Sequence, residues 1–420
     1  MDTDQIGRSS VADVYKGERL AATLTRTSRA VTFQYLEDYA QKGLPPVAHS
    51  LPVLGGGERV VTENGALPAF FAGLLPEGFR FSQLAHELKV STSDEFRLLL
   101  AVGANVPGDV RILPHGVDPQ MDLGLDAEVD IDSGLDFSEY IGKLDPVSLP
   151  GFQGKISARR ARRAITARGR AVATDRSSAP AQASSDQYIL KYDAPGLPLL
   201  SRNELAHLDA ARIMGIPVEV AELCTDVHGR EGLLAKRFDR VVLPGQLHIT
   251  RLAMEDAGQL LNIPPAAKYD PSTEEVSEAL VGACAAKPVA RRNIFMQSAF
   301  AYFTGNGDLH AKNYSVLQGV DGVWTMAPIY DIPSTYVYGD KEMALSICGR
   351  KRDLRLAHWL EFADAIGLPR KAAVTALRKV LRAAERVDLG QVGYSGSTLR
   401  GAQRALEHRR DGVERDLSAL

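Results

Sequence analysis

A short polar segment between a predicted helix and a predicted hairpin constrains this chain most. Residues 291–304 place apolar side chains at helical spacing, and Gly305-Asn306-Gly307 ends that helix because glycine readily takes positive φ angles. Residues 314–317 and 323–326 then alternate on either side of a glycine-containing turn, as in a hairpin. The sequence therefore predicts a buried helix, a polar loop over residues 306–313, a hairpin, and an aspartate just beyond it.

The polar loop and the aspartate contain the side chains that phosphoryl transfer requires. Asp308 can orient an attacking hydroxyl and accept its proton, while Asn313 and Asp331 offer the oxygen ligands that Mg²⁺ prefers. Asp and Asn more commonly cap turns, so the spacing of Asp308 and Asn313 alone is weak evidence. The prediction of a phosphotransferase site is stronger because the loop also contains His310 and Lys312 and because Asp331 follows it in the expected order.

A glycine-punctuated loop and a strand lysine lie upstream. Residues 148–155 read Ser-Leu-Pro-Gly-Phe-Gln-Gly-Lys, in which glycine lets backbone amides approach phosphates and lysine adds a positive charge. The spacing is not that of a Walker A motif, and alone the segment would be an ordinary turn. Residues 187–192 favour a strand that carries Lys191, and that arrangement is similar to the phosphate-contacting lysine of kinases. A strand lysine more often just faces solvent. The prediction for Lys191 therefore depends on its place in the sequence, between the glycine-punctuated loop and the polar loop.

Glu204 has two interpretations. Ser201 precedes a helical pattern, and Glu204 completes a capping box with it. Kinase folds also use a helix glutamate here to anchor the strand lysine, which would pair Glu204 with Lys191. The sequence leaves both interpretations open.

Further elements follow from periodicity. Strands are predicted over residues 11–15, 20–25 and 30–35, and helices over 67–88 and 93–102. Three C-terminal helices are predicted over 354–366, 370–387 and 398–420. Residues 155–170 are rich in arginine and contain no acidic residue. Such a run is usually a solvated face, and it could also contact ATP, a target or DNA.

Together these residues resemble the HipA family of serine/threonine kinase toxins from bacterial toxin–antitoxin modules. The resemblance covers almost the whole chain and rests on residues 70–78, 94–99, 148–155, 236–240, 307–313 and 329–332. It implies an α+β, two-lobed protein-kinase-like fold with a small N-terminal α/β extension and a helical C-lobe. The expected parts are an N-terminal subdomain (1–115), an N-lobe with the phosphate loop and strand lysine (116–238), and a C-lobe with the catalytic and metal-binding loops (239–420).

The resemblance also implies roles for individual residues. Asp308 would be the catalytic base, and Asn313 and Asp331 would hold Mg²⁺. The ATP contacts would be Pro150, Gly151, Phe152, Gln153, Gly154, Lys155, Lys191, Lys236, Arg237, Phe238, His310 and Lys312. Among these, Lys236 to Phe238 would hold the adenine through backbone hydrogen bonds and apolar contact. His310 could instead only support the loop geometry. Ser148 would be a regulatory autophosphorylation site, where an added dianion would repel ATP phosphates and shut the enzyme off. Without the resemblance, Ser148 would be a hydroxyl that closes a turn.

The implied cofactors are ATP and Mg²⁺, and the implied partners are a protein substrate and a HipB-like helix-turn-helix antitoxin. Family precedent for the substrate points to aminoacyl-tRNA synthetases. Contact with operator DNA would be indirect, through the antitoxin, because no helix-turn-helix is evident in this chain. Two other functions stay open: a small-molecule kinase, since residues 307–313 also resemble the loop of choline and aminoglycoside phosphotransferases, and a decayed kinase acting as a corepressor. The intact site residues and the N-terminal extension favour the protein kinase.

Composition narrows the class of protein. The 420 residues, 45% of them hydrophobic, are enough for about two or three packed units. A net charge of −3 gives no global sign of nucleic-acid binding. Cys224, Cys284 and Cys348 are too far apart for a zinc motif or a disulfide framework, which favours a reducing cytoplasm. We see no signal-peptide pattern and no apolar run of about 18 residues, so a cytoplasmic protein without a membrane span is expected.

Overall fold

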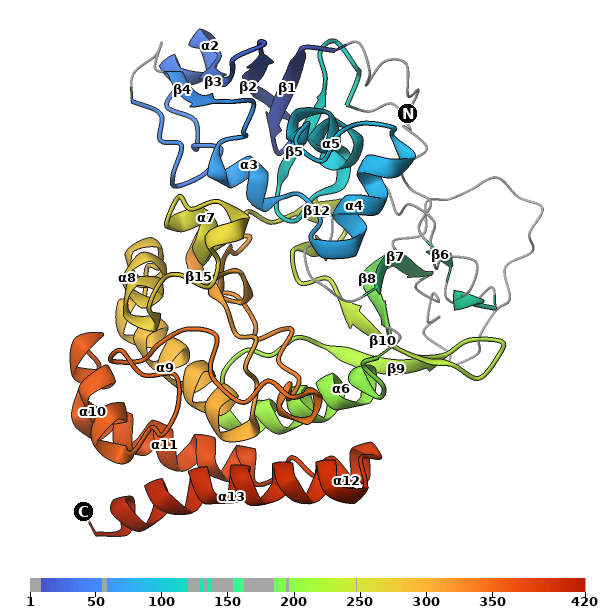
Figure 1. The fold of residues 1–420 in the computed structure, drawn as a ribbon. Coiled ribbons are helices and arrows are strands. Elements are labelled where there is room, and N and C mark those ends of the chain that lie inside the picture. Colours follow the sequence, from blue (N-terminus) through green and yellow to red (C-terminus); the bar gives the residue numbers. More distant parts are fainter. Residues whose placement is uncertain are drawn as a thin grey trace.

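The computed structural model describes residues 9–54, 59–119, 129–130, 134–137, 154–161, 185–193, 196–246 and 248–419. Two five-stranded sheets, a two-stranded sheet, a three-stranded sheet and a set of helices make up this part of the chain, which confirms the predicted α+β class. Figure 1 shows the first sheet at one end of the molecule, the C-terminal helices at the other, and the second sheet to one side between them.

The N-terminal subdomain, residues 9–114, is built on an antiparallel sheet of order β4-β3-β2-β1-β5. Its strands are β1 (Val11–Lys16), β2 (Arg19–Arg26), β3 (Ala30–Tyr35), β4 (Arg59–Glu63) and β5 (Val110–Pro114). Buried and half-buried side chains alternate along β3, as expected for a sheet with one covered face. The helices are α2 (Glu37–Gln41), α3 (Ala69–Gly73), α4 (Gly78–Glu87) and α5 (Glu95–Val102), and their apolar side chains share one core with the strands.

One helix prediction in this subdomain is wrong. The single helix expected over residues 67–88 is two helices, α3 and α4, separated by residues 74–77. Pro76 lies in that break, and proline has no backbone N–H to donate within a continuous helix. The periodic apolar pattern continues across the break because both helices bury side chains in the same core.

The second sheet has the order β6-β7-β8-β10-β9 and is antiparallel except for the β6–β7 pair. Its strands are β6 (Val129–Asp130), β7 (Gly154–Ala161), β8 (Ser185–Tyr192), β9 (Ala221–Thr225) and β10 (Glu231–Lys236). Helix α6 (Leu200–Ala211) packs against β9 and β10. The predicted capping box is absent: α6 begins at Leu200, after a left-handed Leu199, and the Ser201 hydroxyl donates to Asp193 instead.

The remaining part, residues 240–419, is mainly helical and is called the C-lobe below. Its helices are α7 (Ala257–Leu260), α8 (Thr273–Ala283), α9 (Lys287–Thr304), α10 (Leu356–Ala365), α11 (Arg370–Ala384), α12 (Leu389–Val392) and α13 (Gly396–Ser418). Its short strands are β11 (Arg240–Val242), β12 (Ile249–Arg251), β13 (Met254–Asp256), β14 (Ser315–Gln318) and β15 (Trp324–Met326). Helix α9 is buried along most of its length and packs beside α11. In the described part of the chain, no helix combines the length and the apolarity that a bilayer span requires.

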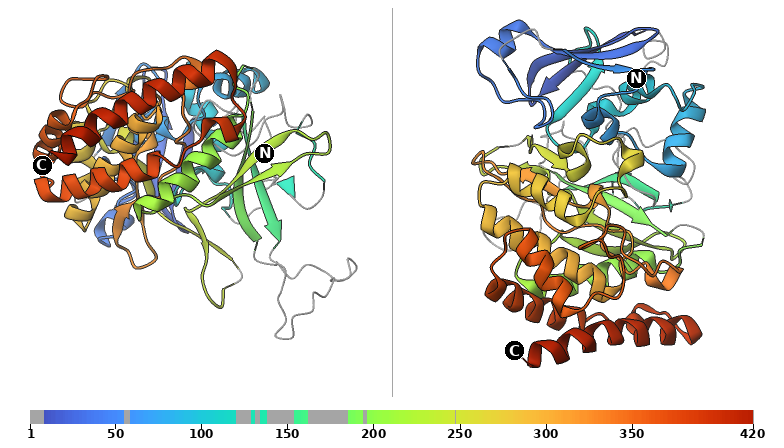
Figure 2. Two further views of the ribbon diagram at one scale, coloured as in Figure 1. Left: turned by 90° about the horizontal axis from the view of Figure 1, so that it is seen from below. Right: turned by 60° about the vertical axis from the view of Figure 1, so that its left-hand side comes forward.

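The N-terminal subdomain rests on the C-lobe around α7. Figure 1 shows α7 directly beside α3, and the right-hand view of Figure 2 shows the first sheet stacked above the C-lobe. Gln259 of α7 donates to the Phe70 carbonyl oxygen at 2.9 Å, and Glu255 of β13 accepts from His49 Nδ1 at 2.7 Å. Asp239 accepts from the Gly108 amide at 3.0 Å. These contacts join segments that lie more than a hundred residues apart in the sequence.

Candidate functional site

The polar loop over residues 306–313 is stabilised in part by hydrogen bonds from its own side chains. Helix α9 ends at Gly305, whose φ angle is 77°, and a short 3₁₀ turn over residues 311–313 leads into β14. Asn306 Oδ1 accepts from the Asp308 amide at 2.8 Å, and Asn313 Nδ2 donates to the Asp308 carbonyl oxygen at 3.1 Å. The predicted helix, loop and hairpin are therefore present in the predicted order.

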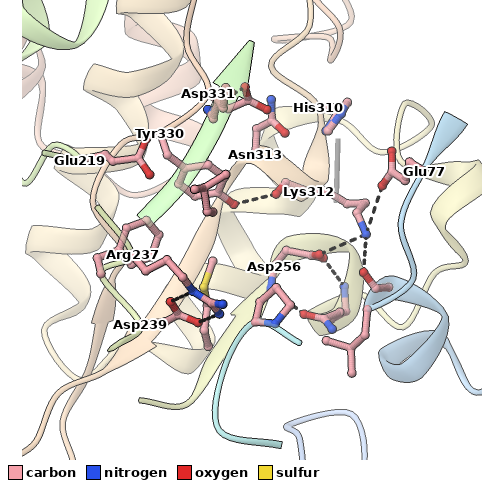
Figure 3. Close-up of a pocket in the computed structure, with 18 residues that line it drawn as sticks. Glu77, Glu219, Arg237, Asp239, Asp256, His310, Lys312, Asn313, Tyr330 and Asp331 are labelled. Atoms are coloured by element: carbon pink, nitrogen blue, oxygen red, sulfur yellow. Dashed lines mark hydrogen bonds and ion pairs between the residues drawn. The ribbon is translucent and has the colours of Figure 1, made fainter. Parts of the chain in front are cut away.

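A cavity lies between this loop, the second sheet and the N-terminal subdomain; together with the solvent at its opening it has about 900 Å³ of empty space. The residues that line it (Figure 3) are Gly73, Leu74, Glu77, Pro107, Ile189, Lys191, Glu219, Arg237, Phe238, Asp239, Met254, Asp256, Gln259, His310, Lys312, Asn313, Tyr330 and Asp331. Seven of the predicted site residues are among them: Lys191, Arg237, Phe238, His310, Lys312, Asn313 and Asp331.

Lys191 of β8 forms a buried ion pair with Glu204 of α6. Lys191 Nζ lies 2.5 Å from Glu204 Oε1 and 3.4 Å from Asp331 Oδ1, and the two paired side chains are 3% and 0% exposed. Burial alone would lower the pKa of Lys191, but Glu204 and Asp331 raise it above its ordinary value. The cavity thus contains a fixed ammonium, and of the two interpretations of Glu204 the structure shows the contact with Lys191.

Asn313 and Asp331 line the same region of the cavity, where Figure 3 shows them near each other. Asp331 follows Tyr330 with a left-handed φ angle of 54°, an uncommon conformation for a residue other than glycine. Because the Asn313 amide nitrogen donates to the polar loop, the carboxamide oxygen remains to bind a ligand. One carboxylate and one carboxamide oxygen beside the cavity suit Mg²⁺, which usually takes few protein ligands and completes its shell with water and phosphate.

Asp308 lies on the polar loop beside the cavity, and Tyr269 donates a hydrogen bond to it. The distance from the Tyr269 hydroxyl to Asp308 Oδ1 is 2.7 Å. Burial raises the pKa of Asp308 above its ordinary value, and the bond from Tyr269 partly opposes that shift. The raised pKa makes this carboxylate a better proton acceptor than an ordinary aspartate.

His310 and Lys312 differ in what they offer the cavity. Burial, and then the charge of Lys268, lower the pKa of His310 to about 3, so its ring is neutral. His310 is 6% exposed, and its Nδ1 has no hydrogen-bond partner among the described residues. The Lys312 ammonium is bound by other residues of the cavity wall: it donates to the Gly73 carbonyl oxygen at 2.7 Å and lies 3.2 Å from Glu77 Oε1.

The predicted adenine segment, Lys236 to Phe238, is only partly at the cavity. Lys236 pairs with Asp186 at 3.1 Å and does not line the cavity. Its backbone amide and that of Arg237 donate to other carbonyl groups of the chain, those of Val220 and Gln187. Phe238 lines the cavity with its ring 5.7 Å from that of Tyr330. An apolar contact from Phe238 fits the prediction better than a backbone contact from Lys236.

The predicted phosphate loop falls mostly outside the described residues. This holds for Ser148, Pro150, Gly151, Phe152 and Gln153. The backbone of Gly154 and Lys155 begins β7, where Lys155 is the pairing partner of Lys191 across β7 and β8.

Several residues in the cavity or next to it were missed in the sequence analysis. Glu77, Asp256 and Tyr269 follow no chemical pattern with residues 306–313, and each comes from a distant part of the chain. The one available signal was the place of Glu77 inside the family-like segment 70–78. Their roles depend on contacts between segments, which a local pattern does not contain.

Comparison with known proteins identifies the family of this chain. A family model of the HipA-like C-terminal domain matches residues 147–387, and a model of the HipA N-terminal domain matches residues 12–113. The chain belongs to the HipA family. A similar relative is the Serine/threonine-protein kinase toxin HipA of Shewanella oneidensis, 27% identical over 88% of this chain and 86% of that protein. HipA in the solved complex of Shewanella oneidensis HipA, HipB and operator DNA superposes with a TM-score of 0.71 and 20% identity, covering 97% of this chain and 99% of that one.

Proposed function

We propose that this HipA-family chain is an ATP- and Mg²⁺-dependent serine/threonine protein kinase. The observation that carries the proposal is the convergence of Lys191, Asn313 and Asp331 on one cavity beside Asp308. These residues come from β8, the polar loop and the segment after β15, so no local feature of the chain explains their meeting. A relative that spans most of the chain is named a serine/threonine-protein kinase toxin.

Each converging group has a role in phosphoryl transfer. Lys191, held by Glu204, places a positive charge beside the transferred phosphates. Asn313 and Asp331 would hold Mg²⁺, and a bound Mg²⁺ would screen the phosphate charge. Asp308 orients the attacking hydroxyl and accepts its proton.

The cavity also has apolar surface that suits the adenine ring. Ile189, Phe238, Met254 and Tyr330 line it with apolar surface. We propose that the adenine lies against these side chains and that the phosphates extend toward Asn313 and Asp331. The neutral His310, which also lines the cavity, would donate a hydrogen bond to the nucleotide or accept one from it, depending on its tautomer.

The remaining expectations are also part of the proposal. The solved relative is a complex of HipA, HipB and operator DNA, which supports a HipB-like antitoxin as partner and contact with DNA through that antitoxin. We keep Ser148 as the autophosphorylation site. We also keep the division into residues 1–115, 116–238 and 239–420, because each of these segments contributes residues to the cavity.

Incubation of the purified chain with labelled ATP and Mg²⁺, followed by mass spectrometry, tests the function. We expect label on a hydroxyl of a protein side chain, Ser148 first, and we expect Asp308→Asn to lose transfer while it still binds nucleotide. Asp411→Asn is the matched control, because Asp411 is exposed on α13. Transfer by Asp308→Asn at the wild-type rate would show that Asp308 is not the base, and label on an added amino alcohol alone would favour a small-molecule kinase.

A further inference from the structure

Glu77 of the N-terminal subdomain contacts two lysines of the C-lobe at the edge of the cavity. Its Oε2 lies 2.5 Å from Lys268 Nζ, and its Oε1 lies 3.2 Å from Lys312 Nζ. The Glu77 side chain is 14% exposed, so water screens these two ion pairs only in part. Burial alone would raise the pKa of Glu77, but the two lysines lower it, so the carboxylate is charged.

Lys268 connects this carboxylate to the neighbouring tyrosine. The Lys268 ammonium lies 5.2 Å from the centre of the Tyr269 ring, within the range of a cation–π contact. The Lys268 carbonyl oxygen accepts from the Ala311 amide at 3.1 Å, which ties the segment to the polar loop. The edge of the ring also meets His310, with ring centres 5.1 Å apart. The ring of Tyr269, a residue that is 43% exposed, therefore has contacts with Lys268 and His310.

The Tyr269 hydroxyl is then aimed at the base. It donates to Asp308 Oδ1 at 2.7 Å, and within the described part of the chain no other side chain donates to this carboxylate. The lysine of the polar loop does not reach Asp308, because Gly73 and Glu77 hold the Lys312 ammonium. A neutral phenol can orient a carboxylate without cancelling its charge, which leaves the second oxygen able to accept a proton.

We propose that Glu77, Lys268 and Tyr269 are positioning residues, through which the N-terminal subdomain orients the Asp308 carboxylate toward the attacking hydroxyl. The proposal rests on the kinase function proposed above and adds a role for the N-terminal subdomain within the active site. Two things then determine the orientation of the Asp308 carboxylate. One is the polar loop that carries it, and the other is a path of contacts across the domain boundary, from Glu77 to Lys268 to Tyr269 to Asp308. Misorientation of a reacting group by a small distance is enough to slow a reaction strongly.

Tyr269→Phe tests the last contact of the path, since it keeps the ring and removes the hydroxyl. At saturating ATP the rate of autophosphorylation should fall about tenfold, which corresponds to about 1.4 kcal/mol. The dissociation constant of a non-hydrolysable ATP analogue should stay within about twofold of the wild-type value, because Tyr269 does not line the cavity. Tyr39→Phe is the matched control: it removes a hydroxyl that donates to the Pro45 carbonyl oxygen at 2.7 Å, away from the cavity, and should leave the rate unchanged.

Glu77→Gln and Lys268→Met test the earlier contacts. Each should slow transfer, and combining either with Tyr269→Phe should slow it little further, because all three changes interrupt one path. If Glu77→Gln fails to fold, Lys268→Met still gives the answer. A Tyr269→Phe rate equal to wild type, multiplicative effects in the double variants, or a loss of analogue binding without a loss of turnover would each overturn the path. Absence of any transfer by the wild-type chain would overturn the proposed kinase function instead.

Discussion

The buried pair of Lys191 and Glu204 provides a sharp test of the energetics. An exposed pair, Arg202 with Glu231, joins the same helix to the same sheet and serves as its matched control. Removing Glu204 by substitution with Gln leaves the Lys191 ammonium buried with Asp331 as its remaining partner, 3.4 Å away. The two pairs thus differ mainly in burial, because the Arg202 and Glu231 side chains are 43% and 30% exposed.

The expected magnitudes follow from that difference. Breaking a buried ion pair by removing one partner costs about 3–5 kcal/mol, and the remaining Asp331 contact places Glu204→Gln near the lower end of that range. Breaking an exposed pair costs about 0–1 kcal/mol. In a double-mutant cycle, Glu204→Gln with Lys191→Met should therefore show a coupling energy of about 2 kcal/mol or more, and Glu231→Gln with Arg202→Met about 0.5 kcal/mol.

Native-state hydrogen exchange of the amides in β8 and β10 measures both cycles, because these strands carry Lys191 and Glu231. Exchange reports the opening free energy of the sheet and does not require the whole chain to unfold in one step. A coupling energy for the buried pair no larger than that of the exposed pair would refute the reasoning. It would mean that the Lys191 ammonium is solvated in a way that its 3% exposure does not indicate.

Three further predictions concern other residues. Burial lowers the pKa of His207 from 6.5 to about 4, so between these values the unfolded chain binds a proton that the folded chain does not. Stability should therefore rise with pH across this window by about 1.4 kcal/mol per pH unit. In pH-dependent unfolding curves, His207→Gln should lose that part of the slope. An unchanged slope would argue against a neutral buried ring. Gly73→Ala would place a Cβ 2.9 Å from Gln259 Cγ and should lower stability by about 1–3 kcal/mol in thermal melts. Its control is Gly282→Ala on α8, where a Cβ meets nothing within 4 Å and the change should be neutral or stabilising. Equal effects of the two substitutions would contradict the close packing of α3 on α7. Asp331→Asn should raise the Mg²⁺ concentration needed for half-maximal nucleotide binding at least about tenfold in a fluorescence titration, and an unchanged requirement would remove Asp331 from the metal site.

Local patterns predicted the centre of the fold well. Residues 291–304 lie within α9, Gly305 ends it, and β14 and β15 form the hairpin, because helical spacing and glycine turns act over a few residues. The C-terminal helices agree to within a few residues, although α12 was not predicted. The prediction failed where two neighbouring elements bury side chains in one core, as with α3 and α4 on either side of Pro76.

The site divides in the same way. Asp308 and Asn313 could be found because they share one loop, and Lys191 because β8 has a clear strand pattern. Glu77 and Tyr269 could not, since their partners are fixed by the packing of the N-terminal subdomain on the C-lobe. At Ser201 the local pattern gave a wrong prediction. Its place before a helical pattern matches a helix cap, but its hydroxyl donates a hydrogen bond to Asp193, and α6 already begins at Leu200.

The central claim is that one cavity binds the nucleotide through Lys191 and holds the metal through Asn313 and Asp331. A crystal structure of the chain with Mg²⁺ and a non-hydrolysable ATP analogue tests this most directly. We predict a Mg²⁺ ion roughly 2.1 Å from oxygens of both Asn313 and Asp331, with the terminal phosphate facing Asp308. A nucleotide bound elsewhere, or a metal that touches neither side chain, would contradict the account.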